Sequence, residues 1–415
     1  VNMSSRVGGE YPLQTRFWVK GLDDTVPFTF DNRKITLAPG ESRTIELNYT
    51  SPEGVIVKKE LTFNGSTYVI GSALDVINKS TTKLEGGATT VLTAVYYEEF
   101  ARFHSGPVTF VEDKASRLKS DEAAQIGRGG VKWLGLEDKF FLLAMMPGLD
   151  SEISWKQDFV TEESARTELA STIELRPGET KSVAFNSYIG PKEYKIFKEM
   201  PGDIEEAIEF GFFSFMAKPV LSVLNFFQKY FKNYGIAIII LTVLIKIAFY
   251  PLSKKSMSSM GDMQKLQPQM KAIKEKYKED KPRQNKEIMD LYKRHKVNPV
   301  GGCLPMVLQI PVFIALYEVL SVAIDLRHAP FMMWITDLSA MDPYYISPVL
   351  MGGSMFLQQK MSPSGMDPMQ AKMMMMMPVV FTFLFLKFPA GLVLYWLVNN
   401  ILTIAQQYQI QRAKA

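Results

Sequence analysis

The sequence predicts a multidomain protein: an antiparallel β-sandwich followed by an α-helical membrane bundle of five transmembrane helices with a cytoplasmic helical hairpin. Three observations lead to this prediction. The first 200 residues alternate as strands do, every long apolar run lies after residue 210, and the segment 253–300 is strongly basic. The near-neutral average hydropathy of the 415 residues therefore hides a polar half and a membrane half.

Alternating apolar and polar residues mark the first 200 residues as strands, at 44–49, 55–63, 89–97, 131–145 and 181–188. Two similar turns, Ala38-Pro39-Gly40-Glu41-Ser42 and Arg176-Pro177-Gly178-Glu179-Thr180, each precede a strand. Such turns suit antiparallel sheets packed face to face. We therefore assign residues 1–200 to a β-sandwich domain, and we expect its scattered acids on solvated strand faces.

Residues 201–233 are predicted to form an amphipathic helix. One face collects the apolar side chains of Met216, Val220, Val223, Leu224, Phe227 and Phe231. The opposite face holds mostly Lys218, Ser222, Asn225, Lys229 and Lys232. Such a helix can lie in the membrane interface or cap a soluble core, and the apolar run that follows at once favours the interface.

Residues 234–410 are predicted to be the membrane core, with spans at 234–252, 302–325, 343–359, 373–388 and 391–410. The segment 253–300 holds 13 Lys or Arg against 6 Asp or Glu. The positive-inside rule places that segment in the cytoplasm. The β-domain and the loop 326–342 are then outside, whereas the loop 360–372 and the tail 411–415 are inside.

The basic segment is itself predicted to be a helical hairpin. Apolar residues recur at helical spacing on its first arm, at Met263, Leu266, Met270, Ile273 and Tyr277. Asp280-Lys281-Pro282 interrupts the pattern, and a second arm runs on to Lys293 and Arg294. Such a hairpin is either a solvated loop or a docking arm for an anionic partner such as ribosomal RNA or lipid headgroups.

Lys246 lies in the middle of the apolar run 236–252, where a lysine costs at least ~2.5 kcal/mol on insertion scales. Its long side chain could carry the ammonium group to the cytoplasmic surface. The alternative is a water-filled groove that is open to the cytoplasm and contains Lys246 as its positive charge. The spans supply further polar residues that favour the groove: Thr242, Gln309, Glu318, Tyr395, Trp396, Asn399, Asn400, Thr403 and Gln406.

Methionine is dense on the predicted cytoplasmic side, including the run from Met373 to Met377. These flexible side chains suit either a surface that accepts many apolar sequences or simple core filling. The composition excludes other classes. A net charge of +4 without a basic, aromatic stripe argues against a nucleic-acid-binding domain, one cysteine excludes an internal disulfide framework, and three separated histidines make a metal site improbable.

Several motifs in the second half resemble the YidC/Oxa/Alb family of membrane protein insertases, in its Gram-negative form. They are Asn298-Pro299-Val300-Gly301-Gly302-Cys303-Leu304-Pro305, Gln309-Ile310-Pro311-Val312-Phe313, Leu326-Arg327-His328-Ala329-Pro330-Phe331, Asp337-Leu338-Ser339, Asp342-Pro343-Tyr344-Tyr345 and Gly391-Leu392-Val393-Leu394-Tyr395-Trp396. The resemblance covers about residues 200–410, and the order of domains matches as well.

The resemblance implies a transmembrane anchor upstream of Val1, a periplasmic β-supersandwich and a hydrophilic groove in the bacterial inner membrane. Lys246 matches the groove's positive residue, usually an arginine, and Thr242, Gln309 and Trp396 match its lining. We add Tyr395 and Asn399 to this predicted groove. No cofactor is implied. The implied partners are nascent membrane proteins of the phage-coat or ATP synthase c-subunit type, the Sec translocon, the ribosome, the signal recognition particle pathway and membrane lipids.

The sequence therefore predicts an insertase and membrane chaperone that carries out no chemical reaction. A transporter that uses Lys246 and Glu318 as an ion or substrate site is the rival hypothesis. Many transporters have inverted repeats and pairs of interrupted helices, and the five spans show neither. An intramembrane protease is disfavoured because no Ser/His or Asp pair lies within the spans.

Overall fold

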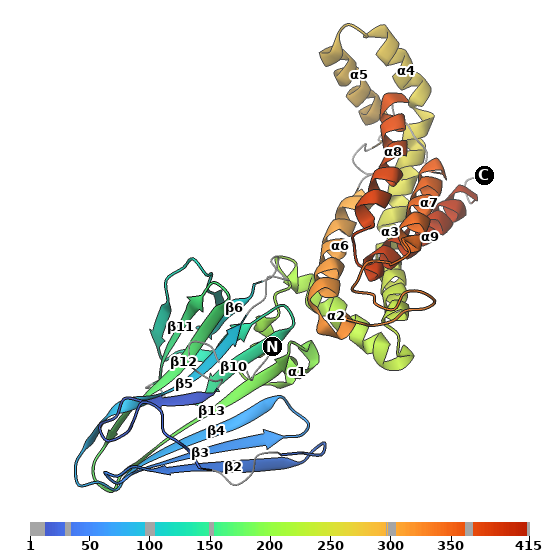
Figure 1. The fold of residues 1–415 in the computed structure, drawn as a ribbon. Coiled ribbons are helices and arrows are strands. Elements are labelled where there is room, and N and C mark those ends of the chain that lie inside the picture. The colour runs from blue at the N-terminus through green and yellow to red at the C-terminus, as the bar shows by residue number, and fades with distance from the viewer. Residues whose placement is uncertain are drawn as a thin grey trace. The chain divides into compact units, whose positions relative to one another are not determined.

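The computed structural model describes residues 13–29, 35–95, 104–148, 153–295, 297, 304–361 and 368–412. It divides the chain into two compact units, Val1–Ile208 and Glu209–Ala415 (Figure 1). The first unit thus extends past the predicted domain boundary at residue 200. It takes in the helix α1 (Tyr194–Glu199), which lies within the predicted domain, and the 3-10 turn η2 (Ile204–Ala207), which lies within the predicted amphipathic segment 201–233.

The first unit is the predicted antiparallel β-sandwich (Figure 1). A five-stranded sheet has the order β1-β5-β12-β11-β8, and an eight-stranded sheet has the order β2-β3-β4-β13-β10-β9-β6-β7. The strands are β1 (Gln14–Phe17), β2 (Ser42–Thr50), β3 (Val55–Asn64), β4 (Val69–Asn78), β5 (Leu84–Val95), β6 (Gly106–Val111), β7 (Lys114–Arg117), β8 (Gln125–Arg128), β9 (Val131–Glu137), β10 (Phe141–Pro147), β11 (Ile153–Thr161), β12 (Ser164–Leu175) and β13 (Thr180–Pro191).

Side chains from both sheets form the core between them. One buried cluster joins Phe17 and Ile173 of the five-stranded sheet to Val57 and Leu74 of the eight-stranded sheet. A second cluster repeats this arrangement further along the same strands. Because successive strand residues point to opposite faces, the residues between these core positions face outward, away from the other sheet.

Both predicted turns precede strands, β2 and β13, and they share one geometry. In each, the glycine has a positive φ, +82° at Gly40 and +89° at Gly178. The glutamate that follows the glycine accepts a hydrogen bond from a backbone N–H three residues earlier, over 2.9 Å at Glu41 and 2.7 Å at Glu179. A side chain at either glycine would be strained in this region of backbone space.

The predicted strand 131–145 is wrong as a single element, because the structure forms the hairpin β9–β10 there. Asp138 makes the turn: its carboxylate accepts hydrogen bonds from the backbone N–H groups of Phe140 and Phe141. Strand β12 was not predicted. Its inward positions include Thr167 and Ser171, and these small polar residues conceal the alternation that identifies a strand.

One acid contradicts the expectation of solvated carboxylates. Glu137 is 1% exposed, with its carboxylate 2.6 Å from Lys192 Nζ and 2.7 Å from Arg117 Nε. Burial alone would raise the pKa of Glu137, but the charges of Lys192 and Arg117 hold it below its usual value. Arg117 also donates to the carbonyl of Ala207, so the cluster fastens the end of this unit to its sheet.

The second unit is helical (Figure 1). Its helices are α2 (Ser214–Phe231), α3 (Tyr234–Lys265), α4 (Gln267–Lys276), α5 (Lys281–Arg294), α6 (Leu304–Val322), η4 (Ile324–Leu326), α7 (Ile346–Met361), α8 (Pro368–Phe385) and α9 (Ala390–Arg412). Each predicted span therefore contains a helix. In the described part of the chain, α3 is long and apolar enough to cross a bilayer, and shorter apolar helical stretches lie at Val307–Val322 and Met373–Phe385.

In this unit two helices begin or end at other residues than the predicted segments do. The span predicted to end at residue 252 continues as one helix, α3, to Lys265, with Pro251 inside it. The amphipathic segment 201–233 is one α-helix only over α2, and its buried positions are Ala217, Val220, Leu221 and Leu224. These face α3 and α6, which α2 contacts, whereas Phe231 of the predicted apolar face is exposed.

The loop between η4 and α7 closes one end of the bundle. Asn233, the N-cap of α3, donates to the carbonyl of Phe331 over 2.8 Å and accepts from the N–H of Ile236. At the start of α9, Gly391 N–H donates to the carbonyl of Leu338. The loop thus fixes the first turns of α3 and α9 side by side, which aligns the residues further along these two helices.

Candidate functional site

Lys246 lies at the contact between α3 and α9. Its ammonium group donates to Thr403 Oγ1 over 2.7 Å, and the Thr403 hydroxyl donates in turn to the carbonyl of Asn399 over 2.6 Å. The lysine is half-buried, and Thr403 and Asn399 are buried. Glu318, the other charged residue considered in the spans, lies beside Gly211 in the segment before α2.

Polar side chains continue along the buried side of α9. Asn399, Thr403 and Gln406 follow at spacings of four and three residues, so they lie along one helix face. All three are at least nine-tenths buried, as are Asn400 and Gln407. Asn400 donates to Ser354 Oγ of α7 over 3.0 Å. A buried surface this polar is expensive among apolar helices, which makes it the candidate functional surface of this unit.

Gln309 of α6 reaches the same helix one turn earlier. Its amide donates to the hydroxyl of Tyr395 over 3.3 Å, and Tyr395 is fully buried. Thr242 is also buried on α3, and its hydroxyl donates to the carbonyl of Ile238 within that helix. The predicted residues thus fall into two polar groups: Lys246 with Asn399, bridged by Thr403, and Gln309 with Tyr395.

Trp396 belongs to an aromatic cluster rather than to either polar group. Its ring packs against Phe313 at 5.1 Å, against Phe385 at 5.3 Å and against Phe381 at 6.0 Å between centroids. The cluster joins α6, α8 and α9. Trp396 therefore borders the polar residues from the apolar side, and it is only partly buried.

Thr403 was identified as a polar residue of the last span but was not assigned to the predicted groove. The sequence carries a signal for it, because Thr403 stands four residues after Asn399 and therefore on the same helical face. What the sequence did not supply is the rotation of α3 relative to α9, which makes Thr403 the hydrogen-bond partner of Lys246.

The hairpin forms as predicted, with a break before α5. Asp280 caps α5 by accepting from the N–H of Arg283 over 3.0 Å, and Pro282 lies in its first turn. However, the predicted apolar docking stripe is internal. The residues Met263, Leu266, Met270 and Ile273 pack against Ile288, Leu291 and Tyr292 of the second arm.

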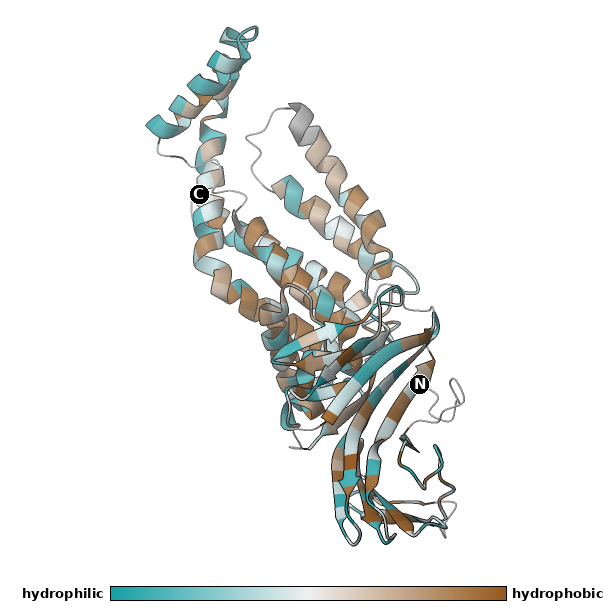
Figure 2. Cartoon of the chain, turned by 90° about the vertical axis from the view of Figure 1, so that its left-hand side faces the viewer, coloured by the Kyte–Doolittle hydropathy of each residue, from teal (hydrophilic) through white to brown (hydrophobic). Residues whose placement is uncertain are grey.

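The surface that remains on the hairpin is basic, and Figure 2 shows α4 and α5 as mainly hydrophilic. Tyr277 is covered by two cations, with the Arg283 guanidinium 5.0 Å and Lys276 Nζ 5.4 Å from its ring centroid. Lys293 and Arg294 are exposed. In the described residues, no group of three or more His, Cys, Asp or Glu side chains is placed to hold a metal ion.

Two family models match the chain in succession. Residues 3–223 match the YidC periplasmic domain, and residues 226–415 match the 60Kd inner membrane protein. These matches, together with the β-sandwich and the helical unit, define an inner membrane protein with a periplasmic domain.

Relatives identify the family. The chain is 49% identical to the membrane protein insertase YidC of Geobacter metallireducens, over 98% of this chain and 77% of that protein. It is 46% identical to the protein of the same name from Geotalea daltonii, over 95% and 76%. A crystal structure of an active YidC insertase matches 92% of this chain and 83% of that one, with 20% identity and a TM-score of 0.46. The chain belongs to the YidC family of membrane protein insertases, which confirms the resemblance in its sequence.

Proposed function

We propose that this protein inserts nascent membrane proteins, its clients, through a hydrophilic groove formed by the polar faces of α3, α6 and α9. The groove would be open to the cytoplasm and to lipid. A client's short hydrophilic outer tail enters it, and the client's apolar helix then moves into the bilayer. The protein carries out no chemical reaction, and transfer of the apolar helix from water to lipid drives the process.

The observation that carries this proposal is the hydrogen bond from Lys246 to Thr403. Deep in an apolar helix, an ammonium group needs water or a polar partner. A neutral hydroxyl is a weak partner compared with a carboxylate, because it offers the ammonium group a dipole and no opposite charge. An acidic group in a client's tail can therefore displace Thr403 and gain from the exchange.

Exposed side chains on α8 support the proposed movement of the client's apolar helix along this protein into the bilayer. Met373, Met375, Met376 and Met377 are all exposed in this unit, as is Phe383. Their exposure favours the contact surface over core filling for the methionine run, because a core side chain would be buried. Flexible methionines fit helices of many sequences, which suits a protein that serves different clients.

The predicted topology completes the proposal. Five helices cross the inner membrane, the β-sandwich domain lies in the periplasm, and the hairpin and the C-terminus lie in the cytoplasm. The internal packing of the hairpin leaves its basic surface to meet anionic partners, for which ribosomal RNA and lipid headgroups are the candidates. Cooperation with the Sec translocon and the signal recognition particle pathway is part of the same proposal.

Photocrosslinking tests the groove. A photoreactive residue is placed at Gln309 or Trp396, and a stalled nascent chain with one apolar segment is the probe. Phe226, exposed on α2, is the matched control position. We expect strong crosslinks from Gln309 and Trp396 and weak ones from Phe226. Equal crosslinking at all three positions would contradict the groove, and transport of ions or solutes by the purified protein without insertion would favour the transporter.

A further inference from the structure

A hollow of about 370 Å³ lies on the outward face of the five-stranded sheet, in the β-sandwich unit. It has no part in the insertion route proposed above. The residues that line it are Arg16, Trp18, Asp24, Thr89, Ile126, Ser154, Trp155, Lys156, Glu168 and Ala170. The volume is in the range of small-ligand sites in proteins.

The strand register explains why the surface is hollow here. Thr89 of β5, Ala170 of β12 and Ser154 of β11 are direct neighbours across three strands. Their small side chains form one outward row. Two residues along, the outward row contains the larger Glu168 and Lys156. The strand pairing therefore places a row of small side chains, the floor of the hollow, beside a row of larger ones that form one of its sides.

Trp18 forms the opposite side of the hollow. It directly follows β1, its N–H donates to the carbonyl of Gly87, and its indole lies over that glycine. A Cβ at position 87 would overlap the indole, so Gly87 allows the ring to lie on the sheet. Trp18 is nevertheless 51% exposed, which leaves a large apolar ring surface beside the floor of the hollow.

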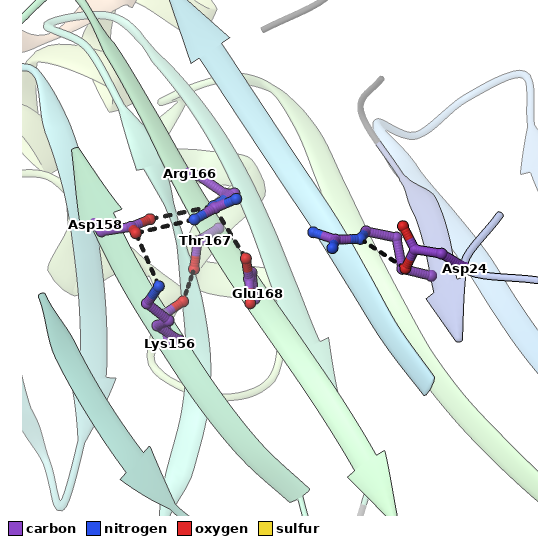
Figure 3. Close-up of polar contacts among 7 residues, drawn as sticks. Asp24, Lys156, Asp158, Arg166, Thr167 and Glu168 are labelled. Carbon is purple, nitrogen blue, oxygen red and sulfur yellow. Dashed lines mark hydrogen bonds and ion pairs between the residues drawn. The ribbon is translucent and has the colours of Figure 1, made fainter. Parts of the chain in front are cut away.

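Paired charges line the hollow. Arg16 Nε lies 3.2 Å from Asp24, and Lys156 Nζ lies 3.0 Å from Asp158 (Figure 3). Arg166 joins Asp158 to Glu168, with nitrogen–oxygen distances of 3.0 Å to each. Every charged group at the hollow thus has an opposite charge beside it, and its lining carries two cations and two anions. Such a lining selects neither a cation nor an anion.

The position within the sheet argues against an extended peptide. Strands β5, β12 and β11 are each paired on both sides, so their backbone groups are already hydrogen-bonded within the sheet. Peptides that recognise sheets add to a free edge and use its unpaired backbone groups. At this hollow a ligand meets side chains only: indoles, hydroxyls, carboxylates, one guanidinium group and one ammonium group.

We propose that the hollow binds a neutral carbohydrate. The apolar face of a sugar ring would lie on the Trp18 indole. Its hydroxyl groups would donate to the carboxylates of Asp24 and Glu168 and accept from Arg16 and from the Ser154 hydroxyl. A sugar combines an apolar face with many neutral donors and acceptors, which is the chemistry that this lining complements.

The test uses the full chain in a detergent without a sugar headgroup, since glycosidic detergents would compete. The probes are maltose, cellobiose and the disaccharide of N-acetylglucosamine, titrated by calorimetry. We expect one of them to bind, and Trp18→Ala and Ala170→Leu to weaken its binding at least ten-fold. Val160→Leu enlarges an exposed residue of β11 outside the hollow and should bind as the wild type does.

The choice of probes separates the sources of the ligand. Binding of the N-acetylglucosamine disaccharide alone assigns the hollow to an amino-sugar glycan of the cell-wall type, and binding of maltose or cellobiose assigns it to a glucose oligosaccharide. Absence of binding by all three disaccharides overturns the proposal. So does binding that Trp18→Ala and Ala170→Leu leave unchanged while their unfolding matches the wild type, or binding of a penta-alanine peptide in place of the sugars.

Discussion

Replacing Lys246 tests whether its charge or its hydrogen-bond geometry matters for insertion. Lys246→Met removes the charge and keeps the length of the side chain, whereas Lys246→Arg keeps the charge. Thr403→Val is the matched control, because it removes the hydrogen bond recorded at 2.7 Å and leaves the ammonium group in place. If charge is what matters, Lys246→Arg and Thr403→Val should both insert clients nearly as the wild type does.

The expected loss of insertion on removing the charge can be estimated from the exchange of Thr403 for a client carboxylate at Lys246. A client carboxylate 4 Å from the ammonium group gains about 4 kcal/mol of Coulomb energy at an effective dielectric constant of 20. Giving up the hydrogen bond to Thr403, whose donor is charged, costs about 1.5 kcal/mol. Full burial of a carboxylate would cost several kcal/mol, and its partial desolvation in a groove open to water is taken as about 1 kcal/mol. The remainder is about 1.5 kcal/mol, which corresponds to roughly a ten-fold difference in insertion.

The assay uses paired clients that differ only in the charge of the outer tail, and it compares variants at matched expression. Lys246→Met should insert the acidic-tailed client about ten-fold less well than the wild type does, and the neutral-tailed client almost equally well. Lys246→Glu should be worse for the acidic tail. Equal insertion of both clients by Lys246→Met at wild-type levels would refute the reasoning, and the lysine would then be one that simply reaches the cytoplasmic surface.

Three further predictions concern stability, measured by chemical unfolding or hydrogen exchange. Burial lowers the pKa of Lys59 to about 8, so Lys59 binds a proton more tightly in the unfolded chain than in the folded one. The free energy of unfolding should therefore rise by about 2.5 kcal/mol from pH 7 to pH 10. Lys59→Met should lack this rise, and a rise of equal size in the variant would exclude Lys59 as its source. Glu137→Ala leaves buried cations without their partner and should lower the free energy of unfolding by about 3 to 5 kcal/mol, against almost nothing for the exposed Glu85→Ala. Leu291→Ala should cost the hairpin about 2 to 4 kcal/mol and speed hydrogen exchange in α4 and α5, whereas Met289→Ala at an exposed position should leave exchange unchanged.

The order of domains and the place of each helix could be predicted because long apolar runs and strand alternation are local signals. The ends of the helices and strands could not be predicted in this way. The first span was predicted to end with its apolar run at residue 252, yet α3 continues through Pro251 to Lys265, because a helix among other helices tolerates a proline whose lost hydrogen bond its neighbours compensate. Strand β12 escaped because Thr167 and Ser171 occupy inward positions, where a sequence pattern expects apolar residues.

Site residues show the same division between local and long-range information. Lys246 was identifiable from its surroundings in the chain, since a cation in an apolar run is anomalous wherever it folds. Its partner Thr403 lies 157 positions away, and only packing of α3 on α9 selects it. Likewise, the spacing of Met263 and Met270 indicated helical structure, although the chain divides at Leu266 into α3 and α4. Spacing alone does not say whether the apolar face meets a client or the second arm of the hairpin.

The continuity of α3 ties the hairpin to the buried lysine by residue count. Lys246 and Met263 stand on one uninterrupted helix, 17 residues apart, which places them about 25 Å apart along the axis at 1.5 Å per residue. Each residue also turns the helix by about 100°, so one residue added between them would swing the hairpin about a quarter-turn around the bundle while leaving its own packing intact. The number of residues in α3 between Lys246 and Met263 thus determines the direction in which the hairpin extends from the bundle.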